Sequence, residues 1–502
     1  MKYVIGIDLG TSAVKVLLVN QEGAVCAEVS KEYPLIQPQS GYSEQDPEVW
    51  VTQTLAALRD LVAMADVAAL DIEGISYSGQ MHGLVLLDAR QQVLRNAILW
   101  NDTRTTNQCR KITETLGEQL LTITRNVALE GFTLPKLLWV KEHEPDVFTK
   151  AVTFLLPKDY VRFRMTGILG MDYSDAAGTL LLDVIAGAWS QQICETLAIP
   201  VTLCPPLMES FALVGRLLPG VAAETGLAET TKVFAGGADN ACGAIGAGIL
   251  SAGDTMCSIG TSGVVLSYED NQHRDFRGKV HFFNHAKANA YYTMGVTLAA
   301  GFSLSWFRGT FAPDESFDDL LSHLGESPIG AHGLLFTPYL VGERTPYADA
   351  MIRGSFIGID GNHQRADFTR AVIEGITFSL RESIELFRRE GKEIRRIVSI
   401  GGGAKNDDWL QIQADIFDAT VLKLENEQGP GMGAAMLAAY GCGWFDSLEA
   451  CARKFTRVTK EFTPCANSVR QYEELYRVYT EVYPSTRSIS AELSKFRITS
   501  AD

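Results

Sequence analysis

Two short segments, about 250 residues apart, combine glycine with hydroxyl side chains in a way that suits phosphate binding. Residues 8–12 read Asp-Leu-Gly-Thr-Ser and residues 258–263 read Ser-Ile-Gly-Thr-Ser-Gly, and each lies between two runs that predict β-strands. A tight hairpin of this composition directs backbone N–H groups and hydroxyls at one spot, and glycine lets the backbone approach a phosphate closely. For either segment alone an ordinary turn is the better interpretation. The pair predicts two hairpins, on facing domains, that hold one nucleotide.

An acid ends the first of these strands, and a lysine follows the first hairpin. Asp8 closes the β-rich run at residues 3–7, and Lys15 lies on the outgoing strand. A carboxylate here could hold Mg²⁺ through water, because that ion keeps much of its hydration shell. The lysine could supply a point charge to the phosphates.

A third segment, residues 236–248, joins two glycines to an acid and then to a helix rich in glycine and alanine. Asp239 lies near the start of that helix, where it either caps the helix or acts as a general base. A sugar hydroxyl that attacks phosphorus must lose its proton, and a carboxylate within hydrogen-bond reach can accept it.

Three more segments follow predicted strands, where ligands commonly bind in α/β layers. Residues 78–83 read Ser-Gly-Gln-Met-His-Gly and suit a polyol pocket, although a lone histidine is more often structural. Residues 100–104 read Trp-Asn-Asp-Thr-Arg and offer an aromatic face and polar groups to a sugar, or form a turn with a surface ion pair. Residues 401–406 read Gly-Gly-Gly-Ala-Lys-Asn and form either a platform for a base or ribose or a plain tight turn.

Two other patterns favour different chemistry, and both are weak. Residues 429–434 fit the GxGxxA dinucleotide fingerprint, but as a single match with Pro430 inside the turn. His281 and His285 have the spacing of metal ligands on a helix, yet residues 280–292 predict strands. No Gly-Lys pair is followed by Ser or Thr, so the use of ATP would depend on the paired hairpins.

Composition excludes several function classes. The chain has 502 residues, 46% of them hydrophobic, and a formal net charge of −16. Such a surface repels nucleic acid and anionic membranes, so we expect neither as a partner. No apolar run approaches the ~20 residues of a membrane span, and the N-terminus reaches an acid too early for a signal peptide, so we expect a cytoplasmic protein. Nine scattered cysteines indicate neither a disulfide framework nor a zinc site.

The elements between the motifs alternate as in layered α/β domains. Periodicity predicts helices at residues 50–65, 133–143, 368–389, 407–417 and 433–440, and strands at 74–78, 84–87, 396–400 and 420–424. The chain is too long for one hydrophobic core. Because the strand–turn–strand pattern occurs twice, we expect two domains of one plan at residues 1–249 and 250–485, followed by a polar tail at 486–502.

These motifs resemble those of the FGGY carbohydrate kinases, within the actin-like ATPase superfamily. Residues 131–143 are similar to the first family signature at every defining position, and residues 354–359 with 367–375 resemble the second. The resemblance extends from residue 3 to about residue 439. Residues 42–50, 79–83, 99–102 and 342–346 are similar to the branch that acts on xylulose.

The resemblance implies an α/β fold of two ribonuclease-H-like (actin-like ATPase) domains with the active site in the cleft between them. It also implies roles for individual residues. Asp239 would be the catalytic base, and Asp8 would serve Mg²⁺ through water. The residues facing the sugar would be Met81, His82, Trp100, Asp239 and Asn240. The phosphates would lie on Gly10, Thr11, Ser12, Gly260 and Thr261, and the adenosine beside Gly402, Gly403 and Asn406.

We therefore expect ATP-dependent phosphorylation of D-xylulose to D-xylulose 5-phosphate, with Mg²⁺ as cofactor, in pentose catabolism. Three alternatives stay open: another sugar such as L-xylulose, ribulose or gluconate; a non-catalytic sugar sensor on the same scaffold; and an oxidoreductase that uses the Gly429 segment. A homodimer is the expectation at family level.

Overall fold

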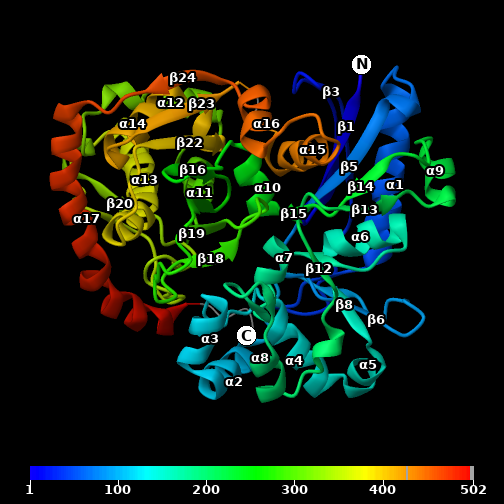
Figure 1. The fold of residues 1–502 in the computed structure, drawn as a ribbon. Helices are drawn as coiled ribbons and strands as arrows, with labels where there is room; N and C mark the ends of the chain where they lie inside the picture. Colours follow the sequence, from blue (N-terminus) through cyan, green and yellow to red (C-terminus); the bar gives the residue numbers. More distant parts are fainter. Residues whose placement is uncertain (426–427, 498–502) are drawn as a thin grey trace.

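Two large mixed β-sheets, each covered by helices, organise the molecule (Figure 1). The structure is a computed structural model that describes residues 1–425 and 428–497. The first sheet has the strand order β13-β14-β5-β1-β2-β3, with β15 paired to β5, and the second has the order β18-β19-β17-β16-β22-β23-β24. The expected α/β fold with two domains is confirmed.

The first sheet begins with an antiparallel run of β1 (Tyr3–Leu9), β2 (Ala13–Asn20) and β3 (Val25–Glu32). β1 then pairs in parallel with β5 (Ile72–Gly79), followed by β14 (Lys232–Phe234) and β13 (Leu213–Arg216). The side chains of β1 pack into two hydrophobic cores: Val4 belongs to one core, and Ile5 and Ile7 belong to the other. Strands covered on both faces read as nearly continuous apolar runs, which explains the composition of residues 3–9.

The second sheet repeats this plan. β16 (Asp254–Ile259) and β17 (Gly263–Glu269) form a hairpin, β19 (Tyr291–Thr297) and β18 (His281–Asn284) extend it antiparallel, and β16 pairs in parallel with β22 (Arg396–Gly401). β23 (Thr420–Leu424) and β24 (Val458–Phe462) complete the other edge. The hairpins at residues 10–12 and 260–262 therefore occupy corresponding positions in the two sheets.

Two small-residue helices cross where the two halves meet. α10 (Asp239–Gly246) packs against α15 (Gly429–Gly441), and α15 also packs on β1 and β5 of the first sheet (Figure 1). A Cβ atom on Gly433 would overlap the backbone oxygen of Cys242, so only glycine allows this approach. Residues 429–434, considered above as a dinucleotide loop, form the first turns of α15, and their glycines serve helix packing.

The predicted helices are present: α4 (Thr133–His143) and α14 (Asp407–Phe417) have the predicted bounds, while α1 (Pro47–Met64), α13 (Arg365–Arg389) and α15 begin three or four residues earlier than predicted. His281 lies in β18, so the two histidines do not share a helix. Of the residues expected as a polar tail, 486–493 belong to α17 (Ala466–Leu493), and 498–502 lie outside the described residues. Among the described helices, none has the length and apolar character needed to cross a bilayer.

Further helices and short strands complete the fold. The helices are α2 (Thr106–Leu116), α3 (Glu118–Thr124), α5 (Pro145–Lys150), α6 (Pro157–Thr166), α7 (Tyr173–Ala177), α8 (Gln191–Thr196), α9 (Pro219–Thr225), α11 (Gly301–Phe311), α12 (Phe317–Ser322) and α16 (Leu448–Phe455). The strands are β4 (Glu44–Gln45), β6 (Val85–Leu87), β7 (Ala97–Ile98), β8 (Thr153–Leu155), β9 (Met171–Asp172), β10 (Leu182–Asp183), β11 (Ala188–Trp189), β12 (Leu207–Met208), β15 (Gly237–Ala238), β20 (Leu335–Thr337) and β21 (Ser355–Ile357).

Candidate active site

The five residues predicted to face a sugar line one cavity of about 240 Å³, although they are up to 159 positions apart in the chain. They are Met81, His82, Trp100, Asp239 and Asn240. The sheet brings them together: β5 ends just before Met81, and β15 pairs with β5 just before Asp239, with Ala238 opposite Gly79. The loop ends of neighbouring strands therefore form one wall of the cavity.

The opposite wall comes from the second sheet and from two loops, and sequence analysis had assigned none of its residues to the sugar. Ser262 and Val264 come from the second hairpin and β17, His281 and Phe283 from β18, and Met294 and Val296 from β19. Phe132, just before α4, and Arg344 also line the cavity. The cavity therefore lies between the two halves of the chain. Sequence analysis missed Val264, Phe283, Met294 and Val296 because apolar residues in strands carry no local sign of a ligand.

Asp239 is the first residue of α10 and is partly buried in this cavity. Its Oδ1 accepts hydrogen bonds from the backbone N–H of Asn240 at 2.6 Å and from the Asn240 side chain at 3.1 Å. Burial, with the nearby charge of Asp8, raises the pKa of Asp239 to about 7. A carboxylate with its pKa near neutrality is suited to accept a proton from a hydroxyl.

His82 has a fixed orientation and a defined tautomer. Its backbone has φ 68°, a left-handed conformation that is uncommon outside glycine, and its Nδ1 lies 2.6 Å from the carbonyl oxygen of Gly178. Because a carbonyl oxygen only accepts, Nδ1 carries the proton and Nε2 is an acceptor. Burial lowers the pKa of His82 to about 3, which keeps the ring neutral. The ring can therefore accept a hydrogen bond from a ligand hydroxyl.

The first hairpin is connected to this cavity through Trp100. The indole Nε1 donates a 2.9 Å hydrogen bond to Oγ1 of Thr11. The N–H of Gly10 donates within the hairpin, to the carbonyl of Ala13 at 3.0 Å. Within the described chain, the N–H groups of Thr11 and Ser12 have no hydrogen-bond partner, so they are the donors that this turn offers to an anion.

Lys15, which we expected to contact phosphate, bonds to other side chains in this structure. It lies opposite Asp8 in the strand pair, donates to Oε1 of Gln428 at 2.7 Å, and forms an ion pair with Glu28 at 3.1 Å. It lines neither the sugar-facing cavity nor the second cavity described below. A direct contact between Lys15 and phosphate stays a prediction.

A second cavity, of about 280 Å³, is lined by five of the residues predicted for the nucleotide, while residues 10–12 of the first hairpin lie outside it. Gly260, Thr261, Gly402, Gly403 and Asn406 line it together. Its apolar lining includes Leu304 from α11 with Phe317 and Leu321 from α12, which sequence analysis missed.

The second hairpin stands between the two cavities. Gly260 and Thr261 face the second cavity, whereas the next residue, Ser262, lines the cavity of Asp239. The N–H of Gly260 is used within the turn, on the carbonyl of Ser262 at 3.0 Å, while the N–H groups of Thr261 and Ser262 have no partner among the described residues. One turn therefore borders both compartments, with free donors at the boundary.

The donor set near Asp8 fits a hydrated divalent cation. Burial raises the pKa of Asp8 to about 6, an effect partly offset by the Ser78 hydroxyl and the Lys15 ammonium. The charges of Asp8 and Asp239 also act on each other, so a cation between them would relieve a repulsion. Within the described residues no cluster of three or more metal-ligating side chains exists.

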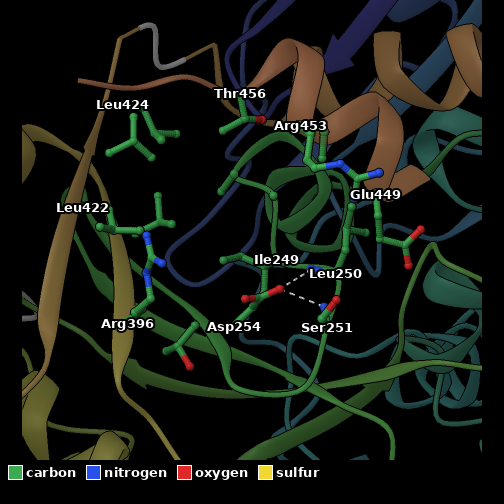
Figure 2. A pocket seen from close by; sticks show the side chains of 16 residues that line it. Ile249, Leu250, Ser251, Asp254, Arg396, Leu422, Leu424, Glu449, Arg453 and Thr456 are labelled. Carbon is green, nitrogen blue, oxygen red and sulfur yellow. Dashed lines mark hydrogen bonds between the residues drawn. The ribbon is translucent and has the colours of Figure 1, made fainter. Parts of the chain in front are cut away.

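A further cavity, of about 400 Å³, lies at the link between α10 and β16 and contains none of the predicted site residues (Figure 2). Figure 2 shows Arg396 and Arg453 at its margins and the carboxylate of Asp254, which accepts the N–H groups of Leu250 and Ser251 at 3.1 and 2.8 Å. Those bonds fix the connection between the two halves of the chain.

Comparison with known proteins identifies relatives over the full length. The model of the FGGY family of carbohydrate kinases, N-terminal domain, matches residues 3–246, and that of the C-terminal domain matches residues 255–442. The chain is 66% identical to a xylulose kinase of Bacillus subtilis (strain 168), over 99% of this chain and 100% of the relative. It is 40% identical to a xylulose kinase of Escherichia coli (strain K12), over 86% and 89%.

Two solved structures share the fold over nearly their whole length. A ligand-bound xylulose kinase from Lactobacillus acidophilus superposes with a TM-score of 0.93 at 29% identity, covering 98% of this chain and 100% of that one. A gluconate kinase from the same organism gives a TM-score of 0.91 at 30% identity, covering 99% and 100%.

Proposed function

The chain belongs to the FGGY family of carbohydrate kinases, and from that premise we propose that it transfers the γ-phosphoryl group of ATP to the C5 hydroxyl of D-xylulose. The observation that carries the proposal is the second hairpin, which borders a cavity with an apolar wall on one side and the cavity of Asp239 on the other. The full-length xylulose kinase relatives support xylulose as the acceptor.

In this proposal the second cavity takes the nucleotide. Leu304, Phe317 and Leu321 provide an apolar surface for the base, and the turn at Gly402 and Gly403 leaves room for the ribose. The phosphates extend along the second hairpin toward Asp239. The N–H groups of residues 11–12 and 261–262 then donate to phosphate oxygens from the two sides, where they stabilise the charge that develops during transfer.

The sugar occupies the cavity of Asp239. As the C5 oxygen bonds to the γ-phosphorus and the bond from that phosphorus to ADP breaks, the hydroxyl proton passes to the Asp239 carboxylate. Nε2 of His82 accepts a hydrogen bond from another hydroxyl and orients the chain of the sugar. Mg²⁺, held by Asp8 through water, would neutralise charge on the phosphates when bound. Because the walls come from both domains, their closure on the sugar would exclude water.

A coupled assay of ADP release over a panel of acceptors tests the proposal. We expect D-xylulose to give the highest kcat/KM, above L-xylulose, ribulose and gluconate, and we expect turnover to require Mg²⁺. A higher kcat/KM with another acceptor would show that this acceptor, and not D-xylulose, is the substrate. Binding of sugar without any release of ADP would instead favour a sensor.

The setting of the enzyme is a separate prediction. We propose that it works in the cytoplasm, where ATP is available, and as the homodimer expected from the family resemblance. Light scattering of the purified protein measures the second point directly, and a mass near 55 kDa, that of one chain, would contradict it.

A further inference from the structure

Arg344 is a partly buried cation on which the charges of Glu130 and Glu343 act, but neither carboxylate forms an ion pair with it. Its guanidinium lines the cavity of Asp239, and in residues 1–425 and 428–497 it makes no hydrogen bond or ion pair. Burial lowers the pKa of Arg344 from its usual range, since desolvation disfavours the charged form. The N–H groups of the guanidinium therefore face the cavity with no hydrogen-bond partner among the described residues, and they can donate to a ligand.

The backbone around Arg344 is held rigidly. The preceding residue, Glu343, is buried, and its carboxylate accepts the N–H groups of Arg344 at 2.8 Å and Leu298 at 3.1 Å, together with the hydroxyls of Thr297 and Ser379. The N–H of Thr345 donates to the carbonyl of Val296 at 3.0 Å, and its hydroxyl accepts the N–H of Val296 at 3.0 Å. The loop is thus fixed to the end of β19, which sets the point from which the Arg344 side chain enters the cavity.

Arg344 belongs to the wall formed by the second sheet, because the next residue, Thr345, is bonded to Val296 of β19, whereas Asp239 belongs to the wall formed by the first sheet. The positive charge of Arg344 contributes to the low pKa values of His82 and His281. The pKa of Asp239, in contrast, is set by burial, Asp8 and the N–H of Asn240. A sugar with the hydroxyl to be phosphorylated at Asp239 therefore presents its opposite end to Arg344.

In D-xylulose that opposite end carries the C2 carbonyl and the C1 hydroxyl. A guanidinium only donates, and its planar fork can reach two adjacent oxygens at once. A carbonyl oxygen only accepts, so the two groups are complementary. We propose that Arg344 is a substrate-binding residue, contributed from the second domain, that recognises the carbonyl end of the ketose. This role rests on the function proposed above, and it would make the enzyme prefer the ketose to the corresponding polyol, which lacks the carbonyl.

The test compares Arg344→Ala with a matched control, Arg353→Ala. Arg353 lies nine residues further on and does not line the cavity, and its only hydrogen bonds within the described part of the chain go to the backbone carbonyls of residues 350 and 352. We expect Arg344→Ala to lower kcat/KM for D-xylulose about 10- to 100-fold, to change kcat/KM for xylitol less than about threefold, and to leave the KM for ATP unchanged. Added guanidinium ion at millimolar concentration should restore part of the D-xylulose activity.

The outcomes separate this proposal from the function on which it rests. If the wild-type enzyme does not phosphorylate D-xylulose, the proposed function fails. If it does, an unchanged Arg344→Ala variant, or a parallel loss with D-xylulose and xylitol, overturns only the role of Arg344. Should the variant fold poorly, the wild type alone decides: equal kcat/KM values for D-xylulose and xylitol would contradict recognition of the carbonyl.

Discussion

Replacing Asp239 by asparagine should change activity and stability in opposite directions. The asparagine oxygen can still accept the hydrogen bonds from Asn240, so the local geometry is kept. What is lost is the capacity to accept a proton, which general-base catalysis typically uses for about 10²- to 10⁴-fold in rate. We expect kcat to fall by that factor while the affinity for sugar changes little.

The stability gain follows from the raised pKa. The carboxyl has a pKa of about 7 in the folded protein, against about 3.9 in an unfolded chain. Each pKa unit corresponds to ~1.36 kcal/mol, so the ionised group destabilises the fold by roughly 4 kcal/mol above pH 7. Between pH 4 and pH 7 the folded protein retains a proton that the unfolded chain has released, so wild-type stability falls as pH rises through this window. The asparagine variant does not incur this loss.

Scanning calorimetry at pH 8 and pH 5 measures the effect. For a unit of about 250 residues, 1 kcal/mol corresponds to about 2 °C, so Asp239→Asn should raise the Tm by up to ~8 °C at pH 8. The gain should fall by more than half at pH 5. Asp66→Asn, at an exposed position outside the site, is the control and should change neither value. A gain independent of pH would refute the electrostatic reasoning, and full activity would refute the base.

Three other changes test the packing and the two cavities. Gly433→Ala should destabilise the protein by more than ~3 kcal/mol, because its methyl would overlap the backbone oxygen of Cys242; Gly309→Ala, which meets open space, should not, and an equal Tm for both would contradict the helix crossing. Phe317→Ala should raise the KM for ATP about tenfold and leave the KM for sugar unchanged in steady-state assays. If only the KM for sugar rose, the second cavity would bind the sugar and not the nucleotide. Trp100→Phe removes the indole N–H that bonds the first hairpin and should raise the KM for sugar about fivefold. An unchanged KM would show that this hydrogen bond does not contribute to sugar binding.

The sequence predicted the site best where chemistry and backbone geometry coincide. Three of the predicted residues directly follow strands: Gly260, Gly402 and Asp239. Tight turns of that composition allow few backbone conformations, so the position of these residues at the ends of strands could be predicted. Leu304 and Phe317 had no such signal: they are ordinary apolar residues on helices, and only the packing of α11 and α12 against the second hairpin turns them toward a cavity.

The features that the sequence did not predict depend on contacts between residues far apart in the chain. Arg344 lies in a segment recognised only by resemblance, and its role depends on Glu343, whose partners come from β19 and α13. The glycines at residues 429–433 permitted two interpretations, a loop around a ligand or close packing of helices. The choice required knowledge of α10, which lies about 190 residues earlier in the chain.

The structure of a complex with D-xylulose, Mg²⁺ and a non-hydrolysable ATP analogue tests the central claim most directly. We predict that the terminal phosphate contacts the N–H groups of both hairpins, at residues 11–12 and 261–262. The Asp239 carboxylate should then lie about 2.6–3.2 Å from the C5 hydroxyl of the sugar. Phosphates bound away from either hairpin, or an Asp239 carboxylate directed away from that hydroxyl, would contradict the account.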